Sequence, residues 1–244
     1  MIWPVKDNIL HIKDRIARAA RRSGREPDAI RLMAVTKTVN DNRLDEAIAA
    51  GIDMIGENYV QEAKAKIEHL GRPVEWHMIG RLQINKAKFA VKLFDLIHSV
   101  DSIDLAAELD KRSRPLGHPT KILIEVNLSG EKTKSGVPSP MAINLVRQIA
   151  GLQGLSIQGL MTMPPWFDNP ERARPYYAAL RELRNRMNLE GITDRMMHEL
   201  SMGMTGDYEV AVEEGATIVR IGKGIFGERP SRSSPSSYND AAIK

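Results

Sequence analysis

Short runs of apolar and β-branched residues alternate with segments of helical periodicity from residue 31 to residue 222. The strand-like runs are Arg31–Thr36, Asp53–Gly56, Glu75–Gly80, Leu96–Val100, Lys121–Asn127, Ser156–Thr162, Met197–Met202 and Thr217–Gly222. Between them, the apolar spacing predicts helices at 41–50, 59–70, 84–94, 102–114, 139–150, 171–189 and 205–214. Strands that alternate with helices indicate βαβ units and therefore a parallel sheet.

The number of these units favours a closed barrel. Eight strand–helix units in about 200 residues match the lower size limit of the (β/α)8 TIM barrel. An open doubly wound sheet is the alternative, but the residues after the first strand, V-T-K-T at 35–38, lack the G-x-G-x-x-G fingerprint of dinucleotide-binding sheets. We predict an α/β fold, a single TIM barrel over residues 1–230, with a flexible polar tail over 231–244.

The N-terminal segment is predicted to be an extra helix. Its apolar residues recur at helical spacing, at Ile9, Ile12, Ile16, Ala19 and Ala20. The segment also concentrates the positive charge of the chain, since residues 1–25 hold seven Lys or Arg against two Asp, and the whole chain has a net charge of +4. A local basic helix of this kind is not the broad basic surface of a nucleic-acid-binding protein, and aromatic residues make up only 5%.

Other features of the composition exclude several kinds of site. The chain has no cysteine, which excludes disulfides, thiolate catalysis and cysteine-ligated metal centres, and favours a cytoplasmic protein. No apolar run approaches the roughly 20 residues that span a bilayer, so we expect no membrane association. The six histidines show no spacing typical of a metal site. We therefore predict no metal.

A lysine stands directly after the first predicted strand. Lys37 would lie at the C-terminal end of the barrel, where active sites of this fold are found. Among low-dielectric walls, desolvation disfavours the ammonium form and frees the amine as a nucleophile toward carbonyls, as a Schiff base requires. A solvated lysine that caps the strand is the alternative, and position alone favours it because lysine is almost always exposed.

Two further segments close the seventh and eighth predicted strands, S-M-G at 201–203 and R-I-G at 220–222. The phosphate site of a TIM barrel frequently follows these strands. Gly203 and Gly222 would let the backbone approach a ligand, and the following N–H groups could bind an anion. The alternative is that both glycines only turn the chain. Arg220 needs a partner inside the barrel, either a ring nitrogen of a ligand or a neighbouring carboxylate.

Distinct short sequence motifs stand at most of these strand ends. In chain order they are AVTK (34–37), GENYVQE (56–62), WHMIG (76–80), LQ (82–83), NK (85–86), NLSGEKTKSG (127–136), LSMGM (200–204), VRIG (219–222) and IFG (225–227). Together they resemble the pyridoxal phosphate homeostasis proteins, also called proline synthase co-transcribed homologues. The resemblance spans residues 5–229, with the motifs in order on the predicted strands.

This resemblance implies a barrel of the alanine racemase N-terminal type that carries pyridoxal 5′-phosphate (PLP). The cofactor-binding residues that it implies are Lys37 as the Schiff base, Asn58 and Met202 along the ring, Arg220 at the pyridine nitrogen, and Ser201, Gly203 and Gly222 at the phosphate. We assign no catalytic residue. Two positions depart from the family pattern. Val39 stands where many relatives have a second lysine, and Lys223 stands where relatives often have threonine beside the phosphate.

The resemblance favours a carrier that maintains intracellular vitamin B6 and amino-acid homeostasis without strong catalysis. Inversion at an amino-acid Cα usually needs proton donors on both faces of the ring. Related racemases take the second donor from an added domain of the partner subunit, and we expect this chain to lack that domain and to be a monomer. An arginine at the ring nitrogen also weakens the ring as an electron sink. The expected partners are PLP and apo forms of PLP-dependent enzymes.

Two other functions remain open. One is a PLP-dependent amino-acid racemase or transaminase of low activity, in which Tyr59 or His77 acts as the missing base. The other is an aldolase that uses Lys37 without a cofactor, for which the sequence shows no acid–base pair nearby. Colour on purification and amino-acid turnover would separate the three possibilities.

Overall fold

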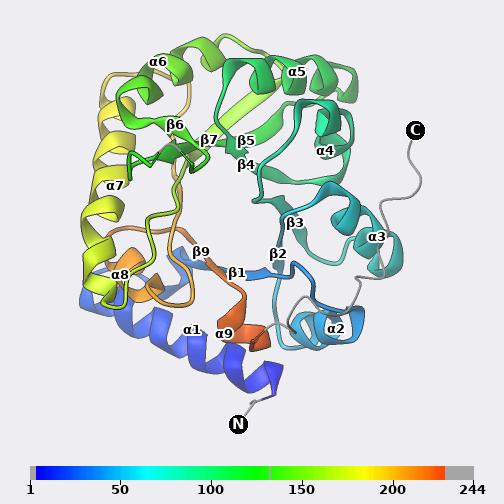
Figure 1. The fold of residues 1–244 in the computed structure, drawn as a ribbon, viewed down its shortest axis with the longest axis vertical. Helices are drawn as coiled ribbons and strands as arrows, with labels where there is room; N and C mark the ends of the chain where they lie inside the picture. The colour runs from blue at the N-terminus through cyan, green and yellow to red at the C-terminus, as the bar shows by residue number, and fades with distance from the viewer. Residues whose placement is uncertain (1–3, 132, 229–244) are drawn as a thin grey trace.

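A ring of helices surrounds a closed barrel of parallel strands in the computed structural model, which describes residues 4–131 and 133–228 (Figure 1). The barrel strands in this part of the chain are β1 (Arg31–Val35), β2 (Met54–Glu57), β3 (Glu75–Met78), β4 (Leu96–Val100), β5 (Thr120–Asn127), β7 (Leu155–Met161), β8 (Glu199–Ser201) and β9 (Ile218–Ile221). Each pairs in parallel with the next, β9 pairs with β1, and the two-residue strand β6 (Val137–Pro138) adds to the end of β5. The predicted (β/α)8 barrel is confirmed.

The helices occupy the predicted positions between the strands. They are α1 (Val5–Arg22), α2 (Asp41–Ala49), α3 (Val60–Leu70), α4 (Ala87–Leu93), α5 (Ile103–Ser113), α6 (Ser139–Ala150), α7 (Arg174–Leu189), α8 (Tyr208–Glu213) and α9 (Lys223–Phe226). Short 3-10 turns, η1 (Pro27–Ala29), η2 (Ile84–Lys86), η3 (Arg114–Leu116) and η4 (Pro170–Ala173), lie between or before them. Asn40 and Ser102 begin α2 and α5 by accepting a hydrogen bond from a first-turn N–H, which satisfies an otherwise unpaired donor.

The extra N-terminal helix is also present. α1 buries one apolar face, formed by Val5, Ile9, Ile12, Ile16, Ala19 and Ala20, and lies outside the ring along α8 and α9 (Figure 1). Outside this apolar face, α1 carries six of the seven basic residues of the N-terminal segment. The tail predicted at 231–244 lies outside the described residues.

Some element ends differ from the predicted ones. The seventh strand was expected to begin at Met197, but β8 begins at Glu199 because the backbone of Met197 bonds both ways with the Asn188 side chain of α7. The last predicted helix was expected from residue 205, but α8 begins at Tyr208. Residues 205–207 form a turn instead, in which the Asp207 carboxylate accepts from the Met204 N–H at 2.7 Å.

Strand alternation divides the core into two layers. A small cluster inside the barrel consists of Met33, Met54, Ile79, Leu96, Leu123, Met161 and Ile218. A larger cluster fills the space between the strands and the helices, as expected for a barrel whose strands are buried on both faces. Gly56 is needed in the inner layer, because a Cβ there would come within 2.5 Å of the Met33 Sδ. The inner face therefore has little spare volume below the mouth.

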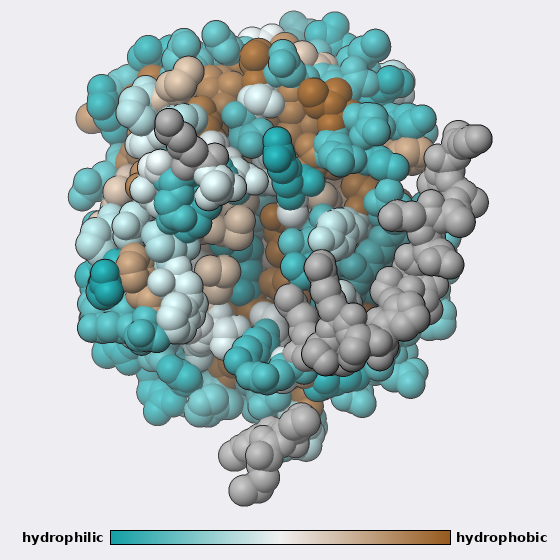
Figure 2. Space-filling view, in the orientation of Figure 1, coloured by the Kyte–Doolittle hydropathy of each residue, from teal (hydrophilic) through white to brown (hydrophobic). Residues whose placement is uncertain are grey.

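The surface drawn in Figure 2 is mostly hydrophilic, with hydrophobic residues visible mainly in its hollowed parts and toward the upper edge. None of the helices in the described ranges is long and apolar enough to span a bilayer.

Candidate functional site

The predicted site residues lie around the end of the barrel at which the strands terminate, called here the C-terminal mouth. Lys37 follows β1 in a turn, and Asn58 follows β2; both residues are half-buried. Gly203 and Gly222 follow β8 and β9, which are neighbouring strands. The fold thus brings strand ends that are far apart in sequence to one rim. Asn58 packs tightly there, since a Cβ at Gly80 would lie 2.4 Å from the Asn58 backbone oxygen.

A buried ionic cluster supports the turn that carries Lys37. The Lys66 side chain of α3 is fully buried, and its ammonium donates to the Thr36 carbonyl at 2.6 Å, to Glu57 Oε1 at 2.7 Å and to Glu62 Oε1 at 2.8 Å. The Thr36 hydroxyl donates to the same Glu57 oxygen. These four residues are called the Lys66 cluster below. They lie between the barrel and α3, directly behind the end of β1.

The Lys66 cluster also reaches the residue after Lys37. Thr38 has a φ of +63°, in the left-handed region that β-branched residues avoid. Its N–H donates to Glu62 Oε1 at 2.6 Å, so the cluster holds this strained residue in place. Both neighbours of Lys37 in the chain are therefore tied to the Lys66 cluster. The backbone at Lys37 is fixed by its neighbours.

Within the Lys66 cluster, Glu57 is under electrostatic strain. Burial raises the pKa of its carboxyl, and the attraction of the Lys66 ammonium only partly opposes this. Its second oxygen, Oε2, is buried and has no hydrogen-bond partner in the described chain. A buried carboxylate in this state depends on Lys66 for its charge balance.

The predicted ring-nitrogen residue, Arg220, is buried inside the barrel near its mouth. Nη1 donates to the Ser201 hydroxyl at 2.7 Å, and Nη2 donates to the Thr162 carbonyl at 2.9 Å. Burial lowers the pKa of Arg220, but a guanidinium stays charged in proteins. No carboxylate in the described residues forms an ion pair with it, so the carboxylate alternative from the sequence does not hold in this structure. Its orientation comes from two neutral acceptors.

The hydroxyl of Ser201 has two partners in the barrel interior. It accepts from Arg220 and lies 2.9 Å from His98 Nδ1. His98 Nε2 is in turn 2.9 Å from His77 Nδ1, and His77 Nε2 is 3.2 Å from Glu75 Oε2. We call this series from Glu75 to Arg220 the histidine chain. The phosphate role that the resemblance implies for Ser201 stays a prediction, since the structure gives its hydroxyl these other contacts.

Met202 faces away from the inner layer. Its side chain is fully buried in the cluster between strands and helices, and its N–H donates to the Ile218 carbonyl at 3.1 Å. Its neighbour Ser201 occupies the opposite, inward face of the strand, as alternation requires. Any contribution of the Met202 side chain to a ligand ring would require it to leave this core.

The segments after β8 and β9 present backbone donors. In the described chain, the N–H groups of Gly203, Gly222 and Lys223 donate no hydrogen bond. The two segments are joined, because the Gly224 N–H donates to the Thr205 hydroxyl at 3.2 Å. Gly203 has a φ of +93° and packs so closely on α8 that a Cβ would lie 2.6 Å from that of Ala211. Converging N–H groups of this kind bind anions.

Lys223, one of the departures seen in the sequence, is not directed at these donors. Its ammonium forms a 2.6 Å ion pair with Glu228, and its side chain is 66% exposed. The other departure, Val39, is half-buried and packs against the main hydrophobic cluster.

A further acidic side chain, which no sequence motif predicts, also faces the mouth. Glu125 of β5 is 3% exposed and accepts no hydrogen bond in the described part of the molecule. Burial and the nearby Asp101 raise its pKa to about 7, against the attraction of Arg220 and Arg81. The only signal for it in the sequence is an acidic residue within the otherwise apolar run I-L-I-E-V at 122–126.

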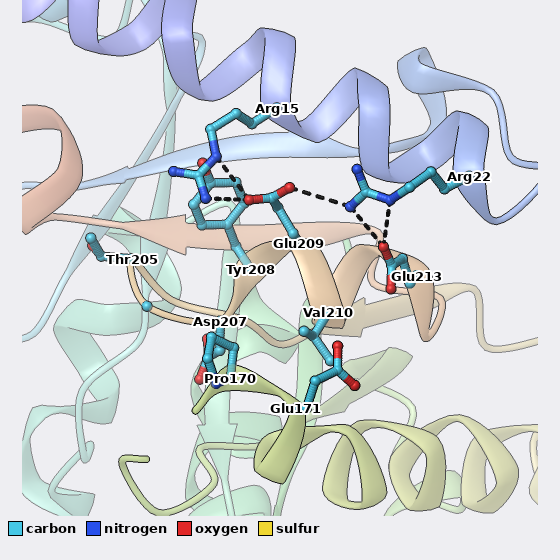
Figure 3. A pocket seen from close by; sticks show the side chains of 11 residues that line it. Arg15, Arg22, Pro170, Glu171, Thr205, Asp207, Tyr208, Glu209, Val210 and Glu213 are labelled. Atoms are coloured by element: carbon cyan, nitrogen blue, oxygen red, sulfur yellow. Dashed lines mark hydrogen bonds and ion pairs between the residues drawn. The ribbon is translucent and has the colours of Figure 1, made fainter. Parts of the chain in front are cut away.

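A surface cavity lies outside the barrel, between α1, η4 and α8. It has a volume of about 230 Å³, and ion pairs cross it: Arg15 and Arg22 of α1 reach Glu209 and Glu213 of α8 (Figure 3). Because these opposite charges pair with one another, we interpret the cavity as part of the contact that holds α1 against α8. A second cavity of about 590 Å³ lies beside the first residues of β5 and β7, away from the C-terminal mouth. No metal-binding group of His, Asp and Glu occurs in the described residues.

Comparisons with known proteins agree with this arrangement. Residues 8–230 match the family model of the alanine racemase N-terminal domain. The chain is 43% identical over 224 residues to the pyridoxal phosphate homeostasis protein of Aquifex aeolicus, covering 91% of this chain and 97% of the relative.

Two solved structures have the same fold. The first is PipY of Synechococcus elongatus with PLP bound, at 36% identity and a TM-score of 0.76, covering 87% of this chain and all of PipY. The second is an alanine racemase of Clostridium difficile, at 12% identity and a TM-score of 0.69, covering 94% of this chain and 57% of the racemase. The latter likeness concerns the barrel alone. The chain belongs to the pyridoxal phosphate homeostasis protein family, which is built on the alanine racemase N-terminal domain.

Proposed function

We propose that this chain binds PLP at the C-terminal mouth, with Lys37 as the Schiff-base residue. The observation that carries the proposal is the convergence of three kinds of group on one rim: the Lys37 amine, the buried Arg220 guanidinium, and the unpartnered backbone N–H groups after β8 and β9. PipY with PLP bound supports it as a related protein of the same fold.

The residues present fit the chemistry of the cofactor. PLP offers an aldehyde, a ring nitrogen and a phosphate, and when bound it supplies a carbonyl for capture and a ring that withdraws electrons. The mouth offers an amine, a fixed cationic donor and a set of N–H donors, one for each of those groups. Lys37 would hold the aldehyde, and Arg220 would donate to the ring nitrogen. The N–H groups of Gly203, Gly222 and Lys223 would bind the phosphate.

The remaining predicted residues take supporting roles in this proposal. Asn58 stands at the mouth beside Lys37 and would flank the ring. Ser201 would act mainly by holding Arg220, and Met202 by packing β8 so that Ser201 faces inward.

We propose further that the chain acts as a carrier, supporting vitamin B6 and amino-acid homeostasis and the supply of PLP to apo-enzymes, without strong catalysis. Arg220 cannot accept a proton, and as a donor it would keep the ring nitrogen unprotonated. His77, which the sequence left open as a base, has both ring nitrogens within hydrogen-bond distance of other groups, so it has none to offer a substrate. The curated relatives share the name of homeostasis proteins.

A weak PLP-dependent racemase is the second candidate. One observation favours it: Tyr59 directly follows Asn58 at the rim, and its side chain is 54% exposed. A phenol there has room to approach a substrate bound at the mouth.

A visible absorbance scan tests the proposal. With PLP added, the wild type should show an absorbance band at a longer wavelength than that of free PLP, and borohydride should bleach this band. Lys37→Ala should lack the band, while Lys64→Ala, on the outer surface of α3, should retain it. Absence of the band in the wild type would refute PLP binding. Turnover of L- or D-amino acids by the loaded wild type, lost in Tyr59→Phe, would favour the racemase.

A further inference from the structure

The histidine chain crosses the interior of the barrel from one mouth to the other. Glu75 is the first residue of β3, and its side chain is 49% exposed beside Arg31, with which it forms a 2.6 Å ion pair. Ser201 is the last residue of β8 and is fully buried. Between them, His77 and His98 are 1% and 0% exposed. A continuous row of hydrogen bonds thus joins the N-terminal rim to the arginine near the C-terminal mouth.

The two ends of the histidine chain fix the direction of its terminal hydrogen bonds. Arg220 can only donate, so the Ser201 oxygen accepts from it at one end. An ionised Glu75 can only accept, so His77 Nε2 must carry a proton at the other end. The His77 hydrogen bond and Arg31 lower the pKa of Glu75 to about 2, which keeps it ionised.

With one proton on each histidine, the directions in the middle of the chain follow. His77 Nδ1 then accepts from His98 Nε2, and His98 Nδ1 accepts from the Ser201 hydroxyl. Both histidines are neutral in this arrangement, and both carry the proton on Nε2. With neutral histidines, the reverse direction would require a protonated Glu75 and would leave the Ser201 hydroxyl proton without an acceptor in the histidine chain.

We propose that His98 and His77 are positioning residues that hold Ser201 with its oxygen toward Arg220, so that the guanidinium is fixed as a donor at the cofactor ring. The role of Arg220 at the cofactor ring rests on the proposed PLP function. The direction of the hydrogen bonds in the histidine chain does not.

The surroundings of the histidine chain support a neutral His98. Burial, His77 and the cationic Arg220 all lower the pKa of His98. The other ionisable groups that face Arg220 are Tyr177, Glu125 and Asp207. A proton on His98 would make both ring nitrogens donors, so the Ser201 oxygen would face two donors and its own proton would lose its acceptor in the histidine chain.

Nitrogen NMR of the cofactor-free protein, labelled with ¹⁵N histidine, tests the orientation. We expect His98 to be neutral, with its proton on Nε2, from pH 5.5 to pH 8, and His77 to carry a proton on Nε2. A proton on Nδ1 of His98, or protonation of His98 between pH 6 and pH 7, would overturn the proposal. This measurement needs no cofactor, so it stands apart from the test of PLP binding.

A pair of serine variants tests the link to the cofactor. Ser201→Ala should shift the His98 Nδ1 resonance and weaken PLP binding about tenfold, as expected for loss of a hydrogen bond to a charged group. Ser99→Ala is the matched control, because Ser99 is also buried on a barrel strand but its hydroxyl bonds to nothing in the described chain. Equal PLP affinity in the two variants would refute the positioning role. If Ser201→Ala does not fold, His98→Asn, which keeps an acceptor, should retain affinity where His98→Leu loses it.

Discussion

Two buried polar systems flank the C-terminal mouth, and they handle charge in opposite ways. The histidine chain keeps its carboxylate and its guanidinium apart, on Glu75 and Arg220 at its two ends, and joins them through hydrogen-bonded side chains. The Lys66 cluster places an ammonium and the Glu57 carboxylate together at full burial. Every side-chain nitrogen and oxygen along the middle of the chain has a partner, whereas Glu57 Oε2 in the cluster has none.

The difference reflects where each system lies and what it supports. Inside the barrel, the histidine chain reaches solvent at Glu75, so the charge of this carboxylate is partly hydrated. Between β2 and α3 the cluster has little access to water, and its charges must balance one another. The histidine chain orients Arg220, and the Lys66 cluster holds the turn around Lys37. The ionic Lys66 cluster is therefore strong but sensitive to loss of one member, while the histidine chain, whose opposite charges lie far apart, tolerates more.

The largest expected effect is in the Lys66 cluster. Lys66→Met should lower the free energy of unfolding by about 3–5 kcal/mol at pH 8, because it leaves Glu57 buried without its counter-charge. The loss should be smaller at pH 5, where Glu57, whose pKa is raised, takes up a proton more readily. Urea unfolding at both pH values measures this. Lys64→Met, in an exposed pair on the same helix, is the control and should change stability by less than about 1 kcal/mol.

Glu125 sharpens the comparison, because it is an interior carboxyl outside both systems. Its pKa in the folded protein is about 7, above its usual value, so the wild type should lose stability as pH rises from about 4.5 to 7. Glu125→Gln should remove this loss and be more stable than wild type by on the order of 2–3 kcal/mol at pH 8. The two proteins should differ little at pH 4. Thermal unfolding across this range is the measurement, and a wild type that gains stability from pH 5 to 7 relative to the variant would contradict the assignment.

A smaller effect is expected within the histidine chain. His98→Asn should cost about 1–3 kcal/mol at pH 8, the usual cost of disturbing a buried hydrogen bond. The lowered pKa of His98 means that the unfolded chain binds a proton there more readily than the folded one, so wild-type stability should fall as pH drops below about 6.5. The variant should show a weaker fall. Chemical denaturation at pH 8 and pH 5 checks the sign, and an unchanged slope would argue against a neutral, buried His98.

The smallest expected effect concerns the strained turn that the Lys66 cluster holds. Thr38→Gly should raise stability by up to about 1 kcal/mol, because glycine adopts the φ of +63° without a Cβ clash. Thr38→Ala keeps the Cβ and should gain little. Equal unfolding midpoints for the two variants would mean that the turn stores no strain.

The fold could be predicted because it depends on periodicity, which each strand and helix carries locally. The start of β8 was harder to predict, since it depends on Asn188 of α7 binding the Met197 backbone. The rim positions of Lys37 and Gly222 follow from strand order alone.

The buried partners could not be predicted in the same way. His77 and His98 are separated by 21 residues, and their contact depends on the stagger between β3 and β4. Lys66 stands four residues after Glu62, a spacing that reads as an ordinary surface pair on a helix. Only the packing of α3 against β2 buries it.

The central claim is that the turn held by the Lys66 cluster presents Lys37 to PLP. The most direct test is to incubate the protein with equimolar PLP, reduce with borohydride, and locate the label by peptide mass spectrometry. The account predicts the label on Lys37, with none at the mouth in Lys37→Ala. A label on Lys223 or on other lysines, with Lys37 unmodified, would contradict it.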